Sequence, residues 1–192
     1  MFIMAMCFAV TGLFLMSTLF IDRGPVLLPL VNIAILLLLS TQLMQDCNIC
    51  FNLQASSMLL QLCFFYFFQD ITFYYTHVFM HQSMMYKHIH YIHHQFRTNS
   101  WRSFLYMHPV ELITCVFFPL FGSVFILQIL DIPVNATSLI VWINLAALNS
   151  MWTHGDSTML GKSILRRHSL HHQYHTCNFG SNMMDNFHGT NR

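Results

Sequence analysis

Residues 58–94 read MLLQLCFFYFFQDITFYYTHVFMHQSMMYKHIHYIHH, and they join a long apolar run to a cluster of histidines. The apolar run covers 58–76 and contains one acid, Asp70. Its length suits a transmembrane helix, which needs roughly 20 predominantly apolar residues. The histidines form two groups with internal spacings of three or four: His77, His81, His90, His93 and His94. Because residues at these spacings share one face of an α-helix, each group is predicted to point its imidazoles at a common place.

Further apolar runs of similar length occur at 2–20, 26–44, 110–130 and 134–152. Only 8% of the 192 residues are charged, whereas soluble domains average about 25%. We therefore predict an all-α integral membrane protein with about four to five transmembrane helices. We divide the chain into an N-terminal transmembrane hairpin, 1–57, and a histidine-rich domain, 58–192.

The basic residues indicate how the chain sits in the membrane. All eight lie in the loops after the first, third and fifth runs: Arg23, Lys87, Arg97, Arg102, Lys162, Arg166, Arg167 and Arg192. Because cytosolic loops are enriched in Lys and Arg, this side is predicted to face the cytosol. The two polar segments that carry most histidines, 80–107 and 153–192, emerge on the same side, so we expect a cytosolic histidine-rich helical cap. A net charge of +1 argues against a nucleic-acid partner, because binding to phosphates requires many basic residues.

A repeated histidine spacing indicates that the cap binds metal. Three groups, called boxes below, share spacings of three or four: the first box (His77, His81), the second box (His90, His93, His94) and the third box (His168, His171, His172). His108 and His154 stand singly between them. Neutral imidazole is a common ligand of Zn, Cu, Fe and Ni. The boxed histidines are too many for one ion and suit two.

Other kinds of metal site fit the composition less well. Carboxylate-bridged di-iron sites need several glutamates, and the chain has one, Glu111. Structural zinc sites usually contain cysteine, and the boxes contain none. Haem needs only one or two axial ligands. A nitrogen-rich centre for two metal ions remains, in which Asp70 and His175 are candidates to orient a ligand through a hydrogen bond.

The chain resembles the fatty acid hydroxylase / sterol desaturase superfamily of membrane histidine-box di-iron oxygenases over about residues 66–190. Five segments carry the resemblance, in order and at fitting spacings: Asp70-x-x-Phe73-Tyr74-x-x-His77-x-x-x-His81, Lys87-x-x-His90-x-x-His93-His94, Tyr106-Met107-His108-Pro109-Val110-Glu111, His154-Gly155, and His168-x-x-His171-His172 followed by Asn178-Phe179-Gly180 and Asp185-x-x-x-Gly189-Thr190. The third segment is typical of the C4-methylsterol oxidase / sterol hydroxylase branch. The chain departs from the family pattern at Met184, where a Trp usually precedes the Asp.

This resemblance implies a di-metal domain at 58–192 that binds two iron ions, with zinc able to occupy the same sites in purified protein. The implied ligands are His77, His81, His90, His93, His94, His108, His154, His168, His171 and His172. Asp70, His175 and Asn178 are expected beside them. The implied reaction is O2-dependent hydroxylation or oxidation of a C–H bond in a lipid from the bilayer, with a sterol or sterol-like substrate favoured.

The resemblance also implies partners and a location. Electrons would come from a separate donor, cytochrome b5 or an NAD(P)H-dependent reductase. The protein is expected in the endoplasmic reticulum membrane, with its histidine boxes facing the cytosol.

Two alternatives stay open at this stage. A desaturase of the same superfamily would use the same site, because the choice between oxygen rebound and a second hydrogen abstraction depends on substrate placement. A catalytically inactive metal-binding homologue would also retain the histidines. Metal transport is disfavoured because transporters place their ligands inside the spans, whereas these histidines lie at or beyond the ends of the apolar runs.

Overall fold

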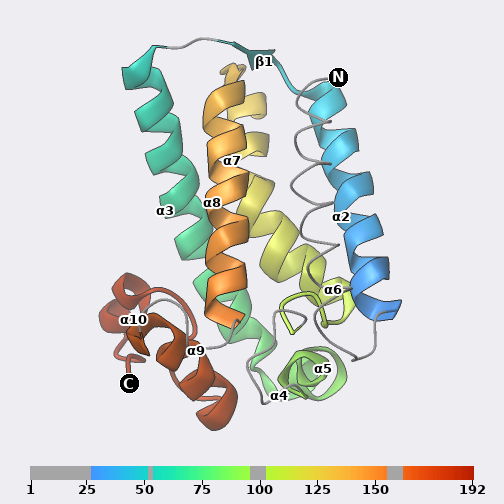
Figure 1. The fold of residues 1–192 in the computed structure, drawn as a ribbon, viewed down its shortest axis with the longest axis vertical. Helices are drawn as coiled ribbons and strands as arrows, with labels where there is room; N and C mark the ends of the chain where they lie inside the picture. Colours follow the sequence, from blue (N-terminus) through green and yellow to red (C-terminus); the bar gives the residue numbers. More distant parts are fainter. Residues whose placement is uncertain (1–26, 52–53, 96–102, 155–161) are drawn as a thin grey trace.

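Four upright helical segments form the body of the molecule (Figure 1). The structure, a computed structural model, describes residues 27–51, 54–95, 103–154 and 162–192. The segments are α2 (Leu27–Asp46), α3 (Ala55–Met80), a continuous run of α6 (Pro109–Glu111), η2 (Leu112–Phe117) and α7 (Phe118–Ile129), and α8 (Ala136–His154). This mostly helical architecture agrees with the predicted all-α class.

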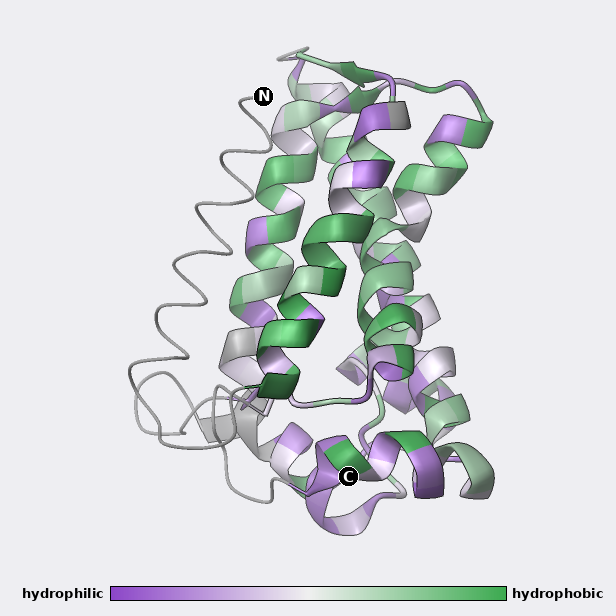
Figure 2. Ribbon diagram, turned by 90° about the vertical axis from the view of Figure 1, so that its right-hand side faces the viewer, coloured by the Kyte–Doolittle hydropathy of each residue, from purple (hydrophilic) through white to green (hydrophobic). Residues whose placement is uncertain are grey.

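Short helices form a cap at one end of this body (Figure 1). They are α4 (Ser83–Met85), η1 (Tyr86–His90), α5 (Tyr91–His94), α9 (Lys162–Tyr174) and α10 (Asn182–His188). Figure 2 shows a largely hydrophobic body above this more hydrophilic cap. The two histidine-bearing segments of the sequence therefore meet at the same end of the bundle, as predicted.

Two helices of the body are long and apolar enough to cross a membrane. They are Leu27–Gln45 and Pro109–Ile129, and they match the predicted spans at 26–44 and 110–130. The predicted spans at 58–76 and 134–152 coincide with α3 and most of α8, which do not pass the same test of length and apolar composition. The span at 2–20 lies outside the described residues, so the number of spans stays a prediction.

The end of the bundle away from the cap contains a short parallel strand pair, which the all-helical prediction did not include (Figure 1). β1 (Ile49–Cys50) pairs with β2 (Val134–Asn135) in the register Ile49↔Val134. The side chain of Gln61 on α3 fixes β2, because its Oε1 accepts from the backbone N–H of Asn135 at 2.8 Å and its Nε2 donates to the oxygen of Pro133 at 2.9 Å. β1 lies in the connection between α2 and α3, and β2 lies in the connection between α7 and α8.

The main core lies where α3, α7 and α8 meet, and α2 packs against it. Phe65 of α3 is fully buried, and its ring centroid lies 6.2 Å from that of Trp142 on α8. Leu43 brings α2 into the same cluster. Burial of such a side chain contributes about 1.5–3 kcal/mol to the stability of the fold.

The predicted division of the chain at residue 57 stays a prediction, since residues 1–26 lie outside the described residues.

A buried asparagine on α2 fixes the segment that leads to the cap-side end of α6. Asn32 is fully buried, and its Nδ2 donates to the backbone oxygens of Leu105 and Met107, each at 2.8 Å. These bonds satisfy carbonyls that are not part of a helix. The position of Glu111, four residues further on, is thereby tied to the bundle.

Two π-helical turns adjust the helix faces near the site. η1 ends at His90, and η2 begins directly after Glu111. A π-turn inserts an extra residue between hydrogen-bonded partners and is frequent at functional sites. It shifts the register of the side chains that follow. The second box therefore begins at the end of a π-turn, whereas its spacing predicts a regular α-helix.

Candidate metal centre

The structure gathers nine histidines into two groups. The five-histidine group contains His77, His81, His90, His94 and His171. The four-histidine group contains His93, His154, His168 and His172. Within each group the candidate ligand atoms all lie within 4.8 Å of one another. Each group therefore brings its imidazoles close enough to share one ion.

The second and third boxes each contribute to both groups, which corrects the expectation that a box points at one place. The residues at i and i+4 of the second box, His90 and His94, enter the five-histidine group, and His93 enters the other. The third box does the reverse, because His171 joins the five-histidine group. Successive residues on an α-helix are rotated by about 100°, so positions i+3 and i+4 diverge enough to face two neighbouring ions.

The two groups lie next to each other. The rings of His94 and His172, one from each group, have centroids 4.5 Å apart. His93 and His172, which share the four-histidine group, are 4.8 Å apart by the same measure. Rings of different groups are therefore as close as rings of one group, and the two candidate sites form one centre.

Backbone carbonyls fix the protonation of several ligands. The Nδ1–H of His77 donates to the oxygen of Phe179 at 2.6 Å, and that of His171 donates to the oxygen of Cys177 at 2.8 Å. In the four-histidine group, the Nδ1–H of His154 donates to the oxygen of Ser150 at 2.9 Å. A carbonyl can only accept, so the proton of each neutral ring is on Nδ1 and its Nε2 carries a free lone pair.

A glutamate performs the same task for His90. Its Nδ1–H donates to Glu111 Oε1 at 2.8 Å, and both side chains are almost fully buried. The other carboxylate oxygen, Oε2, is buried and has no hydrogen-bond partner among the described residues. A carboxylate behind a ligand imidazole raises its basicity and fixes its orientation.

The facing Nε2 atoms show that the donor set fits a metal ion. Nε2 of His77 and Nε2 of His90 are 3.2 Å apart, although the Nδ1 protons of both rings are already donated elsewhere. Two lone pairs at this distance repel each other and cannot form a hydrogen bond. A cation between them removes the repulsion. Nε2 of His154 and Nε2 of His168 make a similar approach at 2.9 Å in the four-histidine group.

The electrostatic environment keeps the ligands of α9 neutral. Burial, followed by the neighbouring His154, lowers the pKa of His172 to about 3 and lowers the pKa of His168 well below its ordinary value. The pKa of His171 is also well below its ordinary value, because of burial and then His77. Only neutral imidazole can donate its Nε2 lone pair to a metal. The rings are therefore ready to bind metal at neutral pH.

Two of the predicted metal-centre residues take other roles. His108 lies outside both groups, and its Nδ1 accepts from the backbone N–H of Val110 at 3.1 Å, which caps the start of α6. We therefore remove it from the proposed ligand set. Asp70 was expected to accept from a ligand imidazole, but its Oδ2 accepts from the hydroxyl of Ser181 at 2.8 Å. It ties α3 to the start of α10.

The other two residues expected beside the ligands do lie close to them. The ring centroid of His175 is 4.6 Å from that of His94. His175 donates from Nε2 to the oxygen of His172 at 2.8 Å, and its Nδ1 accepts from the hydroxyl of Tyr86 at 3.2 Å. Asn178 donates from Nδ2 to the backbone oxygens of Arg167 and Arg192, each at 3.2 Å. Asn178 therefore holds backbone segments near the histidine groups together and makes no bond to an imidazole among the hydrogen bonds described.

Sequence reasoning missed the groups that orient the ligands. Glu111 is the one glutamate of the chain and part of the His-Pro-x-Glu motif, and its place at the start of an apolar run is the only sequence signal of its role. The carbonyls of Cys177, Phe179 and Ser150 leave no signal in the sequence, because every residue has one.

A cavity of about 890 Å³ leads from between the body helices to both groups. Its walls are largely apolar and come from every long helix: Ile33, Leu36, Phe73, Leu120, Phe121, Trp142 and Ala146. At its metal-centre end it is lined by His77 and His90 of one group and by His93, His154 and His168 of the other. This is the upper part of the size range for ligand pockets in proteins, roughly 300–1,000 Å³. An apolar molecule in the cavity would reach both candidate metal sites.

The fold and the site define a helical protein with two adjoining histidine groups, each able to hold a metal ion, at the end of an apolar cavity. The chain belongs to the fatty acid hydroxylase family, whose model matches residues 62–190. The matched region begins in α3 and contains all nine grouped histidines.

The chain is also similar to other proteins over part of its length. The chain is 26% identical to the C-4 methylsterol oxidase erg25 of Schizosaccharomyces pombe over 141 residues, which cover 69% of this chain and 45% of that protein. It is 27% identical over 133 residues to the fatty acid hydroxylase domain-containing protein 2 of Macaca fascicularis and of Homo sapiens, covering 69% of this chain and 38% of each. The chain thus spans less than half the length of these relatives. No solved structure matches it.

Proposed function

We propose that the protein is a membrane oxygenase that hydroxylates or oxidises a C–H bond of a lipid, with a sterol or sterol-like substrate favoured. One observation carries the proposal: two imidazole groups lie side by side at the end of a large apolar cavity. Family membership supports oxidation of a lipid. The relative named as a methylsterol oxidase supports the sterol.

The nine grouped histidines would hold two iron ions, five ligands on one side and four on the other. When bound, the two irons would supply the redox chemistry that lets dioxygen attack an unactivated C–H bond. The protein holds the ligand rings in place through the carbonyls behind His77, His154 and His171. Glu111 holds His90 in the same way. Because these groups fix the orientation of the ligand rings, they would also fix the positions of the two ions at the end of the cavity.

The apolar cavity would bind the substrate and exclude water from the centre. Aromatic and aliphatic side chains such as Phe73, Phe121 and Trp142 suit a lipid skeleton. The two apolar helices of the body fit a protein that takes its substrate from the bilayer. We propose that electrons come from a separate cytochrome b5 or NAD(P)H-dependent reductase, and that the cap faces the cytosol from the endoplasmic reticulum membrane.

The test is expression of the protein with a panel of sterols and fatty acids, followed by mass spectrometry of the extracted lipids. A product heavier by one oxygen is expected. His171→Ala removes a ligand of the five-histidine group and His93→Ala removes one of the four-histidine group, and each should abolish product formation. His108→Ala is the matched control, because this histidine lies outside both groups, and it should keep turnover. Turnover that survives His171→Ala or His93→Ala would refute the di-metal mechanism.

The same experiment separates the alternatives. A product lighter by two hydrogens would identify a desaturase that uses the same centre. Protein that binds metal in both groups and yet forms no product with any lipid would be an inactive homologue. Iron must be supplied during expression, because nitrogen-rich sites bind zinc and copper more tightly than iron.

A further inference from the structure

We infer that Asp185 is a positioning residue for the five-histidine group, acting through the backbone of residues 177–180. The inference rests on the metal-binding part of the proposed function. Asp185 lies on α10, outside all three boxes, and it contacts no imidazole through the hydrogen bonds found among the described residues.

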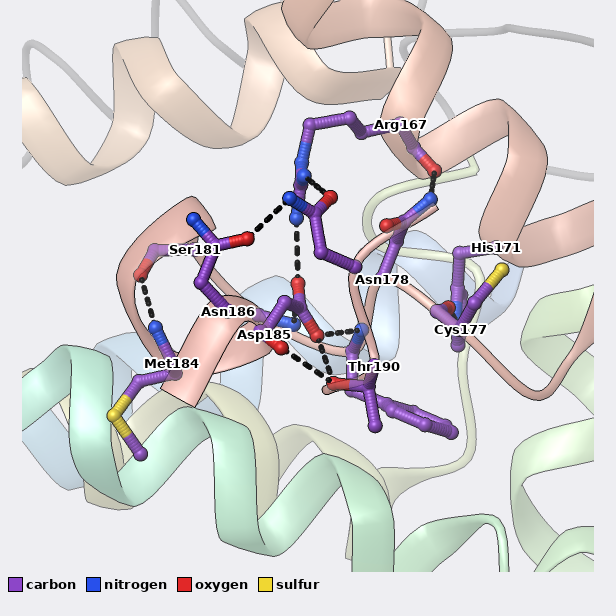
Figure 3. A network of polar contacts seen from close by, with 12 residues as sticks. Arg167, His171, Cys177, Asn178, Ser181, Met184, Asp185, Asn186 and Thr190 are labelled. Atoms are coloured by element: carbon purple, nitrogen blue, oxygen red, sulfur yellow. Dashed lines mark hydrogen bonds and ion pairs between the residues drawn. The ribbon is translucent and has the colours of Figure 1, made fainter. Parts of the chain in front are cut away.

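The carboxylate of Asp185 is the centre of a buried network of hydrogen bonds (Figure 3). Its side chain has no exposed surface. Oδ1 accepts from the N–H of Phe179 at 2.9 Å and from the hydroxyl of Thr190 at 2.7 Å. Oδ2 accepts from the N–H of Gly180 at 3.2 Å and from Nη2 of Arg167 at 2.6 Å. Four donors, one of them charged, satisfy both oxygens of this buried side chain.

The peptide segment that Asp185 holds also orients two ligands. The oxygen of Cys177 accepts from Nδ1 of His171, and the oxygen of Phe179 accepts from Nδ1 of His77. Asn178 between them has a positive φ of 56°, and its N–H donates to the oxygen of Thr190 at 2.8 Å. This left-handed conformation is uncommon outside glycine, although asparagine adopts it more readily than most residues. Thr190 holds it through the bond to Asn178, and Asp185 holds the two residues that follow.

The two ligands concerned come from different boxes but the same group. His77 lies in the last turn of α3 and His171 lies on α9, and both belong to the five-histidine group. In the four-histidine group, His154 is oriented by the oxygen of Ser150 on its own helix. Loss of the Asp185 carboxylate should therefore weaken one metal site and leave the other.

Cobalt binding tests this selectivity. Protein purified in detergent is loaded with Co²⁺, and bound Co²⁺ per chain is measured together with the visible spectrum of the ion. Wild-type protein should bind two Co²⁺. Asp185→Asn should bind one tightly and the other about 10- to 100-fold more weakly, the range measured for partners of metal ligands in other proteins. The part of the spectrum that belongs to the five-histidine group should change, and the other part should not.

Ser181→Ala is the matched control for general damage to the C-terminal segment. Ser181 caps α10 by accepting from the N–H of Met184, and it also donates to Asp70, but it makes no bond to residues 177–180 among the contacts described. This variant should melt at a lower temperature than wild type and still bind two Co²⁺. Two tightly bound Co²⁺ in Asp185→Asn would overturn the inference, and so would equal loss of both ions.

A milder variant covers the case in which Asp185→Asn does not fold. Arg167→Met removes one of the four hydrogen bonds to the carboxylate and keeps those from Phe179 and Gly180. It should weaken the same site by a smaller factor, and unchanged Co²⁺ affinity at both sites would refute the role of the network. Wild-type protein that binds no Co²⁺ would instead refute the proposed function itself.

Discussion

Glu111 offers a direct test of how the protein prepares a ligand. Its Oε1 accepts the Nδ1 proton of His90 at 2.8 Å in a place where His90 is 1% exposed and Glu111 is 3% exposed. Glu111→Ala leaves this Nδ1–H without its acceptor. The ring can then move its proton to Nε2, which is the atom that faces the other ligands, and a protonated Nε2 cannot bind metal.

The expected loss of Co²⁺ affinity follows from the burial of His90 and Glu111. A buried donor left without its partner costs about 1–3 kcal/mol. Since about 1.4 kcal/mol corresponds to a tenfold change in an equilibrium constant, affinity of the five-histidine group for Co²⁺ should fall by about 5- to 150-fold. Glu111→Gln keeps an oxygen that can accept the same proton, so its loss should stay within about tenfold.

Competition between the protein and a chelator of known affinity measures the Co²⁺ affinity of both Glu111 variants. The His108→Ala variant is a control for the loss of a side chain near the same helix start. The test is the order of Co²⁺ affinity among wild type, Glu111→Gln and Glu111→Ala. If Glu111→Ala binds Co²⁺ as tightly as wild type at both groups, the carboxylate does not fix the His90 ring. If Glu111→Gln is as weak as Glu111→Ala, loss of charge rather than loss of the acceptor explains the effect.

Two further predictions concern stability. The metal-free protein should lose stability as the pH falls from about 6.5 towards 3, because His172 has an ordinary pKa of 6.5 when unfolded and a pKa of about 3 when folded. The unfolded state then binds more protons, and melting temperatures that stay constant across this range would contradict the prediction. Gly122→Ala should lower stability by about 1–3 kcal/mol, because a Cβ there would lie 2.5 Å from Cε1 of Phe68. Adding Phe68→Leu should restore part of the loss, as judged by thermal unfolding in detergent, and a double variant no more stable than Gly122→Ala would contradict the clash.

The sequence predicted the positions of the long helices and all nine grouped histidines, because most of these signals are local. Apolar runs mark α2 and the segment that ends in α7, and spacings of three and four mark the boxes. The same spacing could not show that His171 and His172 face different groups, since that depends on where the partner helices lie. Nor could the spacing show that His108 lies outside both groups, because a histidine before a proline can cap a helix as well as bind metal.

The remaining differences come from contacts between distant parts of the chain. Asp70 sits two turns before His77, so helix periodicity suggested a bond between them, but Ser181 is the actual donor to its carboxylate. The β1–β2 pair joins two connections that no pattern links in the sequence. The π-turn that ends at His90 has no counterpart in the spacing of the second box, which fits a regular α-helix.

The bond between His77 and Phe179 also constrains the order in which the protein matures. The two residues are 102 positions apart in the sequence. At synthesis rates of about 5–20 residues per second, the ring of His77 leaves the ribosome about 5–20 s before the carbonyl that will fix its proton. During that interval the five-histidine group lacks the carbonyl that orients His77, and for most of it the group lacks His171 as well. The five-histidine group therefore reaches its full set of orienting bonds only after residue 179 has been synthesised, although His77 lies on a much earlier helix.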